Sequence, residues 1–235
     1  MANAIDTRPL LLSITPTFAE RVTLLTLRPM LKLKYTETLK GTEPEAYFHD
    51  ELHDRKYEMV LGGMAWPTVG SGSAVIVARQ FDSDHLWIVA DCEQDLPGTF
   101  KFMSLAAKRW FCFKWFGNGF DEAYLQFMHS WNRKHDKRTK VHLIDAPFVE
   151  EQNAVAVYFQ LIKETASKLH DATDSDYSGK LDSVAEDLKV EKSQGGHYVS
   201  VLALGYALAA FKIYGHSEAQ FTDVGYEPLD EMSAI

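Results

Sequence analysis

Cysteine is scarce in this chain, and its scarcity excludes two kinds of small scaffold. Cys92 and Cys112 are the only cysteines among 235 residues. They form no CxxC pair and have no histidine at zinc-ligand spacing, so the sequence predicts neither a disulfide framework nor a structural zinc site. Free thiols are typical of a reducing compartment, and we therefore expect a cytoplasmic protein.

Long apolar runs and an excess of positive charge are also missing. The longest uncharged apolar run, Tyr198 to Phe211, is shorter than the roughly 18 to 20 residues of a membrane helix, and Gly205 interrupts it. The N-terminus lacks a basic leader followed by an apolar core, so we expect no export signal. The net charge of -9 does not favour a protein that coats nucleic acid by bulk charge. Any contact with nucleic acid should therefore be local.

Two basic clusters are candidates for such a local contact. They are "WNRKHDKRTK", from Trp131 to Lys140, and "KRWFCFKW", from Lys108 to Trp115. Most charge runs are solvated faces, so a solvated helix end and a half-buried strand are the competing interpretations.

Several catalytic motifs are absent. The chain has no GxxxxGK[ST], and "YSGKL" is only a fragment of that pattern, so it lacks the phosphate-binding loop of an ATP-driven motor. It also has no GxSxG elbow, no HExxH, and no GxGxxG after a strand.

What the chain does contain is enough apolar sequence for one large core, with 46% hydrophobic and 12% aromatic residues. Residues 1–55 are expected to be an extension or linker packed on that core, with a helix from about Thr36 toward "HDELHDRK". Residues 56–215 should form the main domain, and 216–235 an acidic tail. The domain opens with three predicted antiparallel strands over 57–66, 73–81 and 85–93, and the first ends in an uncharged kink from Gly62 to Ala65.

The rest of the domain alternates helices and strands. A short helix and a strand are expected over 95–119, followed by an amphipathic helix over 120–135 with acids in its first turn and bases in its last. Next come a strand ending in Asp145, a further helix, and a last helix that is apolar nearly all round. This order predicts an α/β fold of ribonuclease H-like type: a mixed sheet of three antiparallel and then parallel strands, with helices on both faces.

Three stretches carry a resemblance to a known family: "GGMAWPTVGSGSAVIVA", "KVHLIDAPFVEEQNAVAVYFQLIKE" and "GGHYVSVLALGYALAAF". Together they resemble the C-terminal nuclease domain of viral (phage) large terminase subunits, the enzymes that cut concatemeric DNA during genome packaging. The resemblance extends over roughly Tyr57 to Tyr214. It implies a metal-dependent DNA endonuclease that acts on double-stranded DNA, with other packaging proteins as possible partners and no membrane.

The resemblance also implies the site residues. Nucleases of this type hold two Mg²⁺ or Mn²⁺ ions with carboxylates from distant elements. Ala65 stands where the family has its first aspartate, Asp145 takes the second position, and His197 opens the last helix, where the family has aspartates. Glu151 is a possible auxiliary ligand. The resemblance therefore implies catalytic positions at Ala65, Asp145 and His197. The metal ligands that it implies are Asp145, His197 and Glu151.

Alanine cannot coordinate a metal, and two hypotheses explain why it stands at position 65. Either the chain is a non-cleaving relative, or an aspartate was replaced to disable the enzyme; "GMDWP" would be ordinary for the family, which favours the second. A non-catalytic ribonuclease H-like structural or nucleic-acid-binding protein is the alternative function, and an unrelated α+β core is a third.

The individual candidates also have simpler interpretations. Asp145 and His197 suit turn or helix caps, and Glu151 suits a solvated first helical turn. The acids in "DCE", Asp91 and Glu93, suggest a proofreading exonuclease, but the roughly 30 residues to the next acids in "GNGFDEAYL" are too few for that fold.

Overall fold

The structure, a computed structural model, describes residues 30–36, 45–66, 71–117, 119–146, 154–173, 179–180, 182–183 and 198–214. Its strands are β1 (Leu31–Tyr35), β2 (Ala46–Asp50), β3 (Arg55–Ala65), β4 (Gly72–Gln80), β5 (Leu86–Gln94), β6 (Lys114–Gly117), β7 (His142–Asp145) and β8 (Leu169–Asp171). Its helices are α2 (Leu96–Arg109), α3 (Glu122–Lys134), the 3-10 turn η1 (Lys137–Thr139), α4 (Ala154–Thr165) and α6 (Tyr198–Tyr214).

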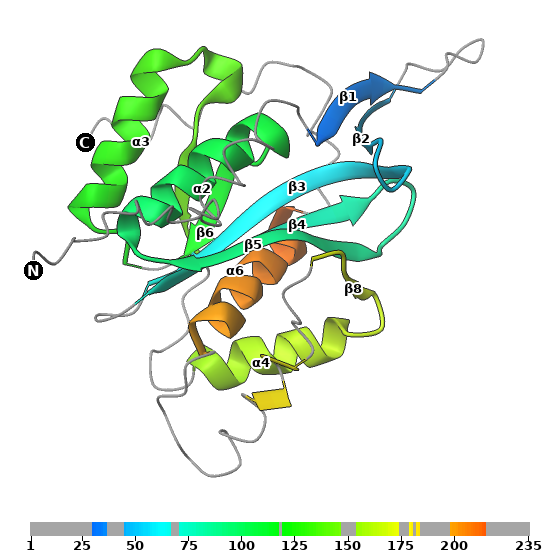
Figure 1. The fold of residues 1–235 in the computed structure, drawn as a ribbon. Helices are drawn as coiled ribbons and strands as arrows, with labels where there is room; N and C mark the ends of the chain where they lie inside the picture. The colour runs from blue at the N-terminus through cyan, green and yellow to red at the C-terminus, as the bar shows by residue number, and fades with distance from the viewer. Residues whose placement is uncertain are drawn as a thin grey trace, which may run out of the picture.

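The long strand β3 lies at the centre of one mixed sheet (Figure 1). On one side it pairs antiparallel with β4, which pairs antiparallel with β5. On the other side its second half pairs parallel with β6, and β6 pairs parallel with β7. Three antiparallel strands are thus followed by two parallel ones, as the sequence predicts, and the ribonuclease H-like fold class is confirmed. Strand β8, which the sequence pattern did not predict, adds a parallel edge beside β5.

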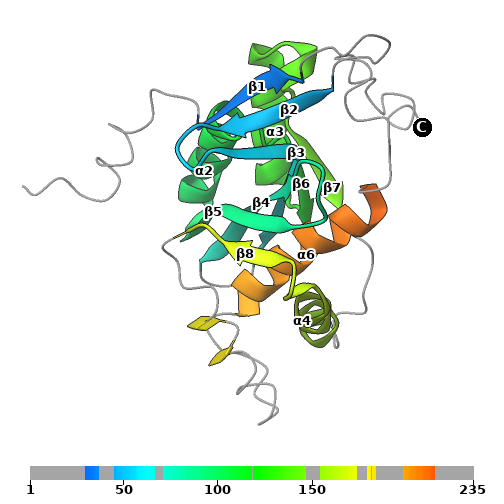
Figure 2. The ribbon, with the colours of Figure 1, turned by 90° about the vertical axis from the view of Figure 1, so that its right-hand side faces the viewer.

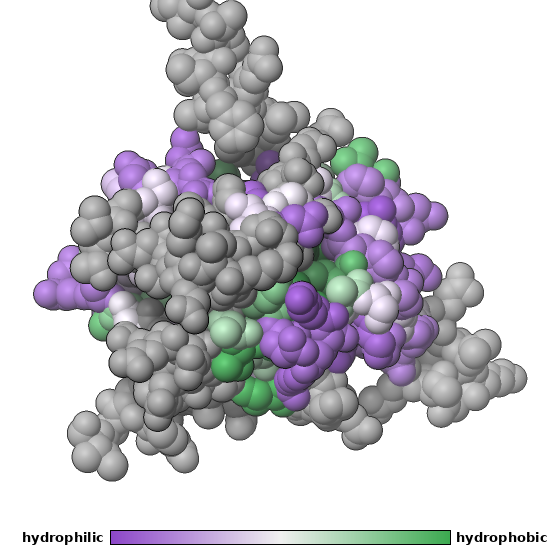
Figure 3. All heavy atoms as spheres, turned by 90° about the horizontal axis from the view of Figure 1, so that it is seen from below, coloured by the Kyte–Doolittle hydropathy of each residue, from purple (hydrophilic) through white to green (hydrophobic). Residues whose placement is uncertain are grey.

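Helices cover both faces of the sheet (Figure 2). Helices α2 and α3 pack on one face through Met103, Ala106, Tyr124 and Trp131. Helix α6 packs on the other face, and α4 packs against it from outside. Figure 3 shows the molecule from the α4 side, where hydrophobic side chains lie among hydrophilic ones; Val157 of α4 is 47% exposed.

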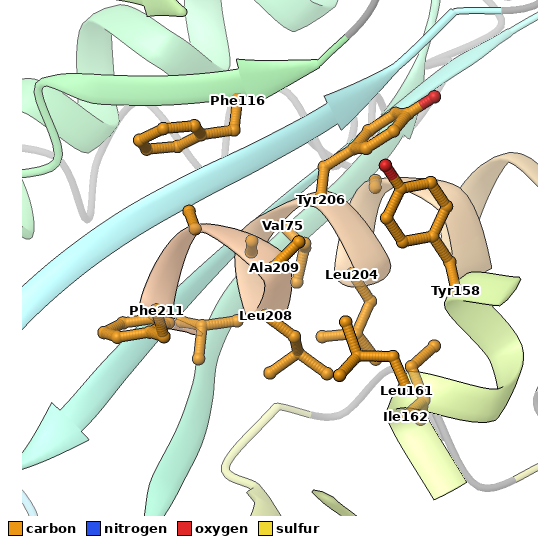
Figure 4. Close-up of a cluster of buried hydrophobic side chains, with 14 of the residues drawn as sticks. Val75, Phe116, Tyr158, Leu161, Ile162, Leu204, Tyr206, Leu208, Ala209 and Phe211 are labelled. Carbon is orange, nitrogen blue, oxygen red and sulfur yellow. The ribbon is translucent and has the colours of Figure 1, made fainter. Parts of the chain in front are cut away.

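The core on the α6 face confirms the predicted buried last helix. Leu204 and Leu208 of α6 meet Leu161 and Ile162 of α4, and Val75 of β4 reaches the same cluster (Figure 4). Full burial of one such side chain contributes about 1.5 to 3 kcal/mol. Among the described side chains of α6, those of Lys212 and Ile213 in the last turn are exposed.

The predicted helix leading into "HDELHDRK" is wrong. Residues 46–50 form strand β2, which pairs with both β1 and the start of β3. The carboxylate of Asp50 accepts hydrogen bonds from the amides of Leu52 and His53, at 3.0 and 3.3 Å, and so stabilises the tight turn into β3. The described part of the expected extension therefore contributes two strands to the sheet. The tail 216–235 lies outside the described residues.

Both helices on the α2–α3 face begin at capping aspartates. The side chain of Asp95 accepts from the amide of Gly98 at 3.0 Å, and Asp121 accepts from the amides of Ala123 and Tyr124 at 3.0 and 3.1 Å. Basic residues occupy the last turn of each helix, where they offset the helix dipole. Within the described residues, no helix is long and apolar enough to cross a membrane.

Candidate functional site

The candidate site lies at the C-terminal end of β3, where two glycines allow close packing on both faces. A Cβ atom on Gly62 would overlap the indole of Trp115. A Cβ atom on Gly63 would overlap the carbonyl oxygen of Ala203 in α6 and lie 2.7 Å from the amide nitrogen of Ala207. The predicted kink is wrong, because β3 pairs with β4 in continuous register from Val60 to the end of the strand, and the register shift lies earlier.

Ala65 is the last residue of β3 and points to the α6 face. Its methyl group is 6% exposed and belongs to the core cluster beneath α6. It lies opposite Ser73 of β4, which in turn lies opposite Glu93 of β5. Residues opposite each other direct their side chains to the same face. Because neighbouring strands are about 4.8 Å apart, Ala65 and Glu93 are about 10 Å apart at their Cα atoms.

Helix α6 begins beside this row of residues. The hydroxyl of Ser200, in its first turn, lies 3.4 Å from a carboxylate oxygen of Glu93. Ser200 and Ser73 are buried polar residues, with exposed fractions of 1% and 2%. The first turn of α6 therefore meets the end of β5 at a small polar patch, whereas β3 contacts α6 further along the helix, at Ala203 and Ala207.

Asp91 extends that patch along β5. It lies on the same face as Glu93, two residues earlier, and its carboxylate is 3.4 Å from the amino group of Lys180. Both side chains are mostly buried, so the lysine charge compensates the carboxylate. Asp91 and Glu93 thus lie on the same face as Ala65, two strands away, an arrangement that sequence reasoning missed. The pairing registers of β3 with β4 and of β4 with β5 place Glu93 in the same row as Ala65, with Ser73 between them.

Asp145 ends β7, and its position differs from the one expected. The resemblance makes it the second metal ligand, a partner of position 65, but β6 lies between β7 and β3. Leu143 packs on the α2–α3 face and Ile144 on the α6 face, so strand alternation directs Asp145 to the α2–α3 face, where it is exposed. Ala65 and Asp145 therefore lie at the same edge of the sheet but on opposite faces.

The strand between these two positions ends in a glycine. Gly117 of β6 lies opposite Asp145. The next acid along the chain, Asp121, is occupied as the N-cap of α3 and so has a structural role.

The other predicted ligands, His197 and Glu151, lie outside the described residues. Across the part of the chain that is described, no group of three or more histidine, cysteine, aspartate or glutamate residues could hold a metal ion. The described residues, with alanine at position 65, therefore do not fit a two-metal centre.

The thiol nearest the site is not a substitute ligand. Cys92 lies between Asp91 and Glu93 but points to the opposite face, into the core beneath α2. Burial raises the pKa of its thiol to about 12, which keeps it protonated at neutral pH.

Comparison with known proteins adds little to this description. No protein-family model matches the chain, and no curated protein matches its sequence. Among solved structures, the chain is similar to the Holliday junction resolvase of fowlpox virus, with 11% identity and a TM-score of 0.43, over 66% of this chain and 99% of the resolvase. It is also similar to the fowlpox virus resolvase in complex with Holliday junction DNA, with 14% identity and a TM-score of 0.38, over 65% and 99%. Because both the sequence identities and the TM-scores are low, the fold assignment rests on the strand order described above.

Proposed function

We propose that this chain is a metal-dependent DNA endonuclease domain of the terminase type, in which position 65 takes the first metal ligand and alanine there removes cleavage. The location of Ala65 supports the proposal. It ends the central strand, points to the α6 face, and shares its cross-strand row with Glu93, whose carboxylate meets Ser200 at the start of α6. An aspartate side chain at this position would extend into a polar patch rather than into a purely apolar core.

The remaining roles follow the family resemblance. It assigns Asp145 and His197 as partners of position 65 in holding Mg²⁺ or Mn²⁺, with Glu151 as an auxiliary ligand. Because Asp145 points to the opposite face of the sheet, its carboxylate would have to reach around the sheet edge to share a metal ion with position 65. The proposed substrate is double-stranded DNA during viral genome packaging, together with other packaging proteins.

Substitution of Ala65 by aspartate tests the proposal. We expect Ala65→Asp to cleave duplex DNA in the presence of Mg²⁺ or Mn²⁺ and not in the presence of EDTA. Ala65→Asn is the matched control, because it has the same size without the charge, and it should not cleave. Adding Asp145→Asn to Ala65→Asp should abolish the gained activity. A folded Ala65→Asp protein that cleaves with neither ion would overturn the proposal.

One observation favours the alternative, a non-catalytic ribonuclease H-like structural or nucleic-acid-binding protein. Ala65 is well packed as an alanine, and the described residues contain no group that could hold a metal. Under this alternative the fold is retained for binding alone, and Ala65→Asp would only destabilise it.

A further inference from the structure

Positive charge is concentrated in one part of this acidic chain. Residues 96–141 contain nine lysines and arginines and three acids, whereas the rest of the chain contains fifteen and thirty. This segment spans α2, β6, α3 and η1, and its helices form the layer on one face of the sheet (Figure 1). The layer formed by α2 and α3 is therefore rich in basic residues.

The fold brings the two basic clusters of the sequence together. The amino group of Lys108, in the last turn of α2, lies 5.8 Å from the ring centre of Trp131 in the last turns of α3. The indole nitrogen of Trp131 donates to the carbonyl of Thr139 at 2.9 Å, which fixes η1 beside both helix ends. The exposed lysines around this junction, here called the basic patch, are Lys101, Lys108, Lys134 and Lys137.

The patch is not neutralised by nearby acids. Among the described residues, none of its four lysines forms an ion pair. The one acid within the second cluster, Asp136, accepts a hydrogen bond from the hydroxyl of Thr139 at 3.2 Å. The lysines at helix C-termini also offset the helix dipoles. That role does not explain Lys101, which lies mid-helix, seven residues before Lys108 and so on the same face.

The aromatic rings in the patch are already covered. Trp131 is 8% exposed, and His135 stacks on it with the ring centres 3.8 Å apart. The guanidinium of Arg109 lies over the ring of Trp110, 4.9 Å from its centre. Single-stranded nucleic acid is bound through bases stacked on open aromatic faces, whereas duplex DNA is held through its phosphates. The patch offers charge without open rings, which fits duplex phosphates.

Both helices also lead to the patch from the edge of the sheet at which β3 ends, on the face opposite Ala65. Helix α3 begins near the end of β3, where the ring centres of Tyr124 and Trp66 are 5.9 Å apart, and α2 begins just after β5 ends. Helix α2 has 14 residues and is therefore about 21 Å long at 1.5 Å per residue. At 3.4 Å per base pair, this length corresponds to about six base pairs.

From this geometry we propose that the α2–α3 face binds the phosphate backbone of duplex DNA, holding it along a line from the basic patch toward the end of β3. This inference rests on the proposed function, since it takes duplex DNA as the substrate, but it does not depend on cleavage.

The test is a binding measurement on the full chain with its native Ala65, in EDTA. Fluorescence anisotropy with a short labelled duplex gives the affinity over a series of salt concentrations. The patch variant is Lys108→Gln/Lys134→Gln. The matched control is Lys163→Gln/Lys168→Gln, which removes the same charge from exposed lysines of α4 and the loop before β8, on the other face. Circular dichroism of each variant verifies folding.

We expect the patch variant to bind more weakly and to reduce the slope of log affinity against log salt by about two, since each lost phosphate contact lowers it by about one. The control should retain the native slope. The inference is overturned if the native chain does not bind the duplex, or if the two variants bind alike. A patch-dependent slope combined with an inactive Ala65→Asp protein would refute the proposed cleavage and leave this binding surface standing.

Discussion

Replacement of Gly63 by alanine should separate α6 from the strand that carries the candidate site. The added methyl group would overlap the carbonyl oxygen of Ala203 and lie 2.7 Å from the amide nitrogen of Ala207. Both neighbours are helix backbone, so no side chain can turn away, and the whole helix must shift. Overpacking in a core typically costs 1 to 3 kcal/mol, and we expect a loss of about 3 kcal/mol here because the contact cannot relax locally.

Urea unfolding, followed by circular dichroism, measures this loss directly. For a domain of this size, about 3 kcal/mol corresponds to a melting temperature lower by about 6 to 12 °C. Gly98→Ala is the matched control, because its methyl group would meet side-chain atoms rather than helix backbone: chiefly the end of the Gln94 side chain, which can turn away, and the carboxylate of the capping Asp95 at 2.9 Å. In helix α2 the alanine should be neutral or stabilise by up to about 1 kcal/mol. Equal unfolding midpoints for the two variants would refute the close packing of α6 on β3.

Two further outcomes follow from local chemistry. Asp121→Ala removes the cap of α3 and should lower the free energy of unfolding by about 1 kcal/mol, measured by urea unfolding; an unchanged midpoint would contradict the capping role. Burial raises the pKa of both Cys92 and Cys112, so a thiol reagent at mildly alkaline pH should label the native protein slowly and the protein in guanidinium chloride fast. Fast labelling of the native protein would show that the thiols are not buried.

Strong local patterns made much of the fold predictable. The apolar strand of β4, the amphipathic α3 with its charge polarity, and the uniformly apolar α6 were each expected from the sequence, because burial on one or both faces determines such patterns. Strand β2 was mistaken for a helix, since the charged residues after it resemble a helical surface, whereas its aromatic residues pair across the sheet.

The candidate site was harder to predict because it depends on pairing between distant strands. Strand β6 has four residues, and nothing in them indicates that they lie between β3 and the strand ending in Asp145. The position of Glu93 in the same row as Ala65 depends on two hairpin registers, and each contains an irregularity, one between Tyr57 and Met59 and the other between Ile76 and Val77. Short parallel pairings and bulges leave no periodic signal in a sequence.

Titration calorimetry with Mn²⁺ tests most directly whether position 65 belongs to a metal site. The measurement compares the native chain with Ala65→Asp, and Ala65→Asn controls for the change in size. We predict that Ala65→Asp binds Mn²⁺ clearly more tightly than the other two proteins, because only aspartate adds a carboxylate to the polar patch at the end of β3. Equal binding by all three proteins, or binding by none of them, would contradict the account and favour a non-catalytic role for the fold.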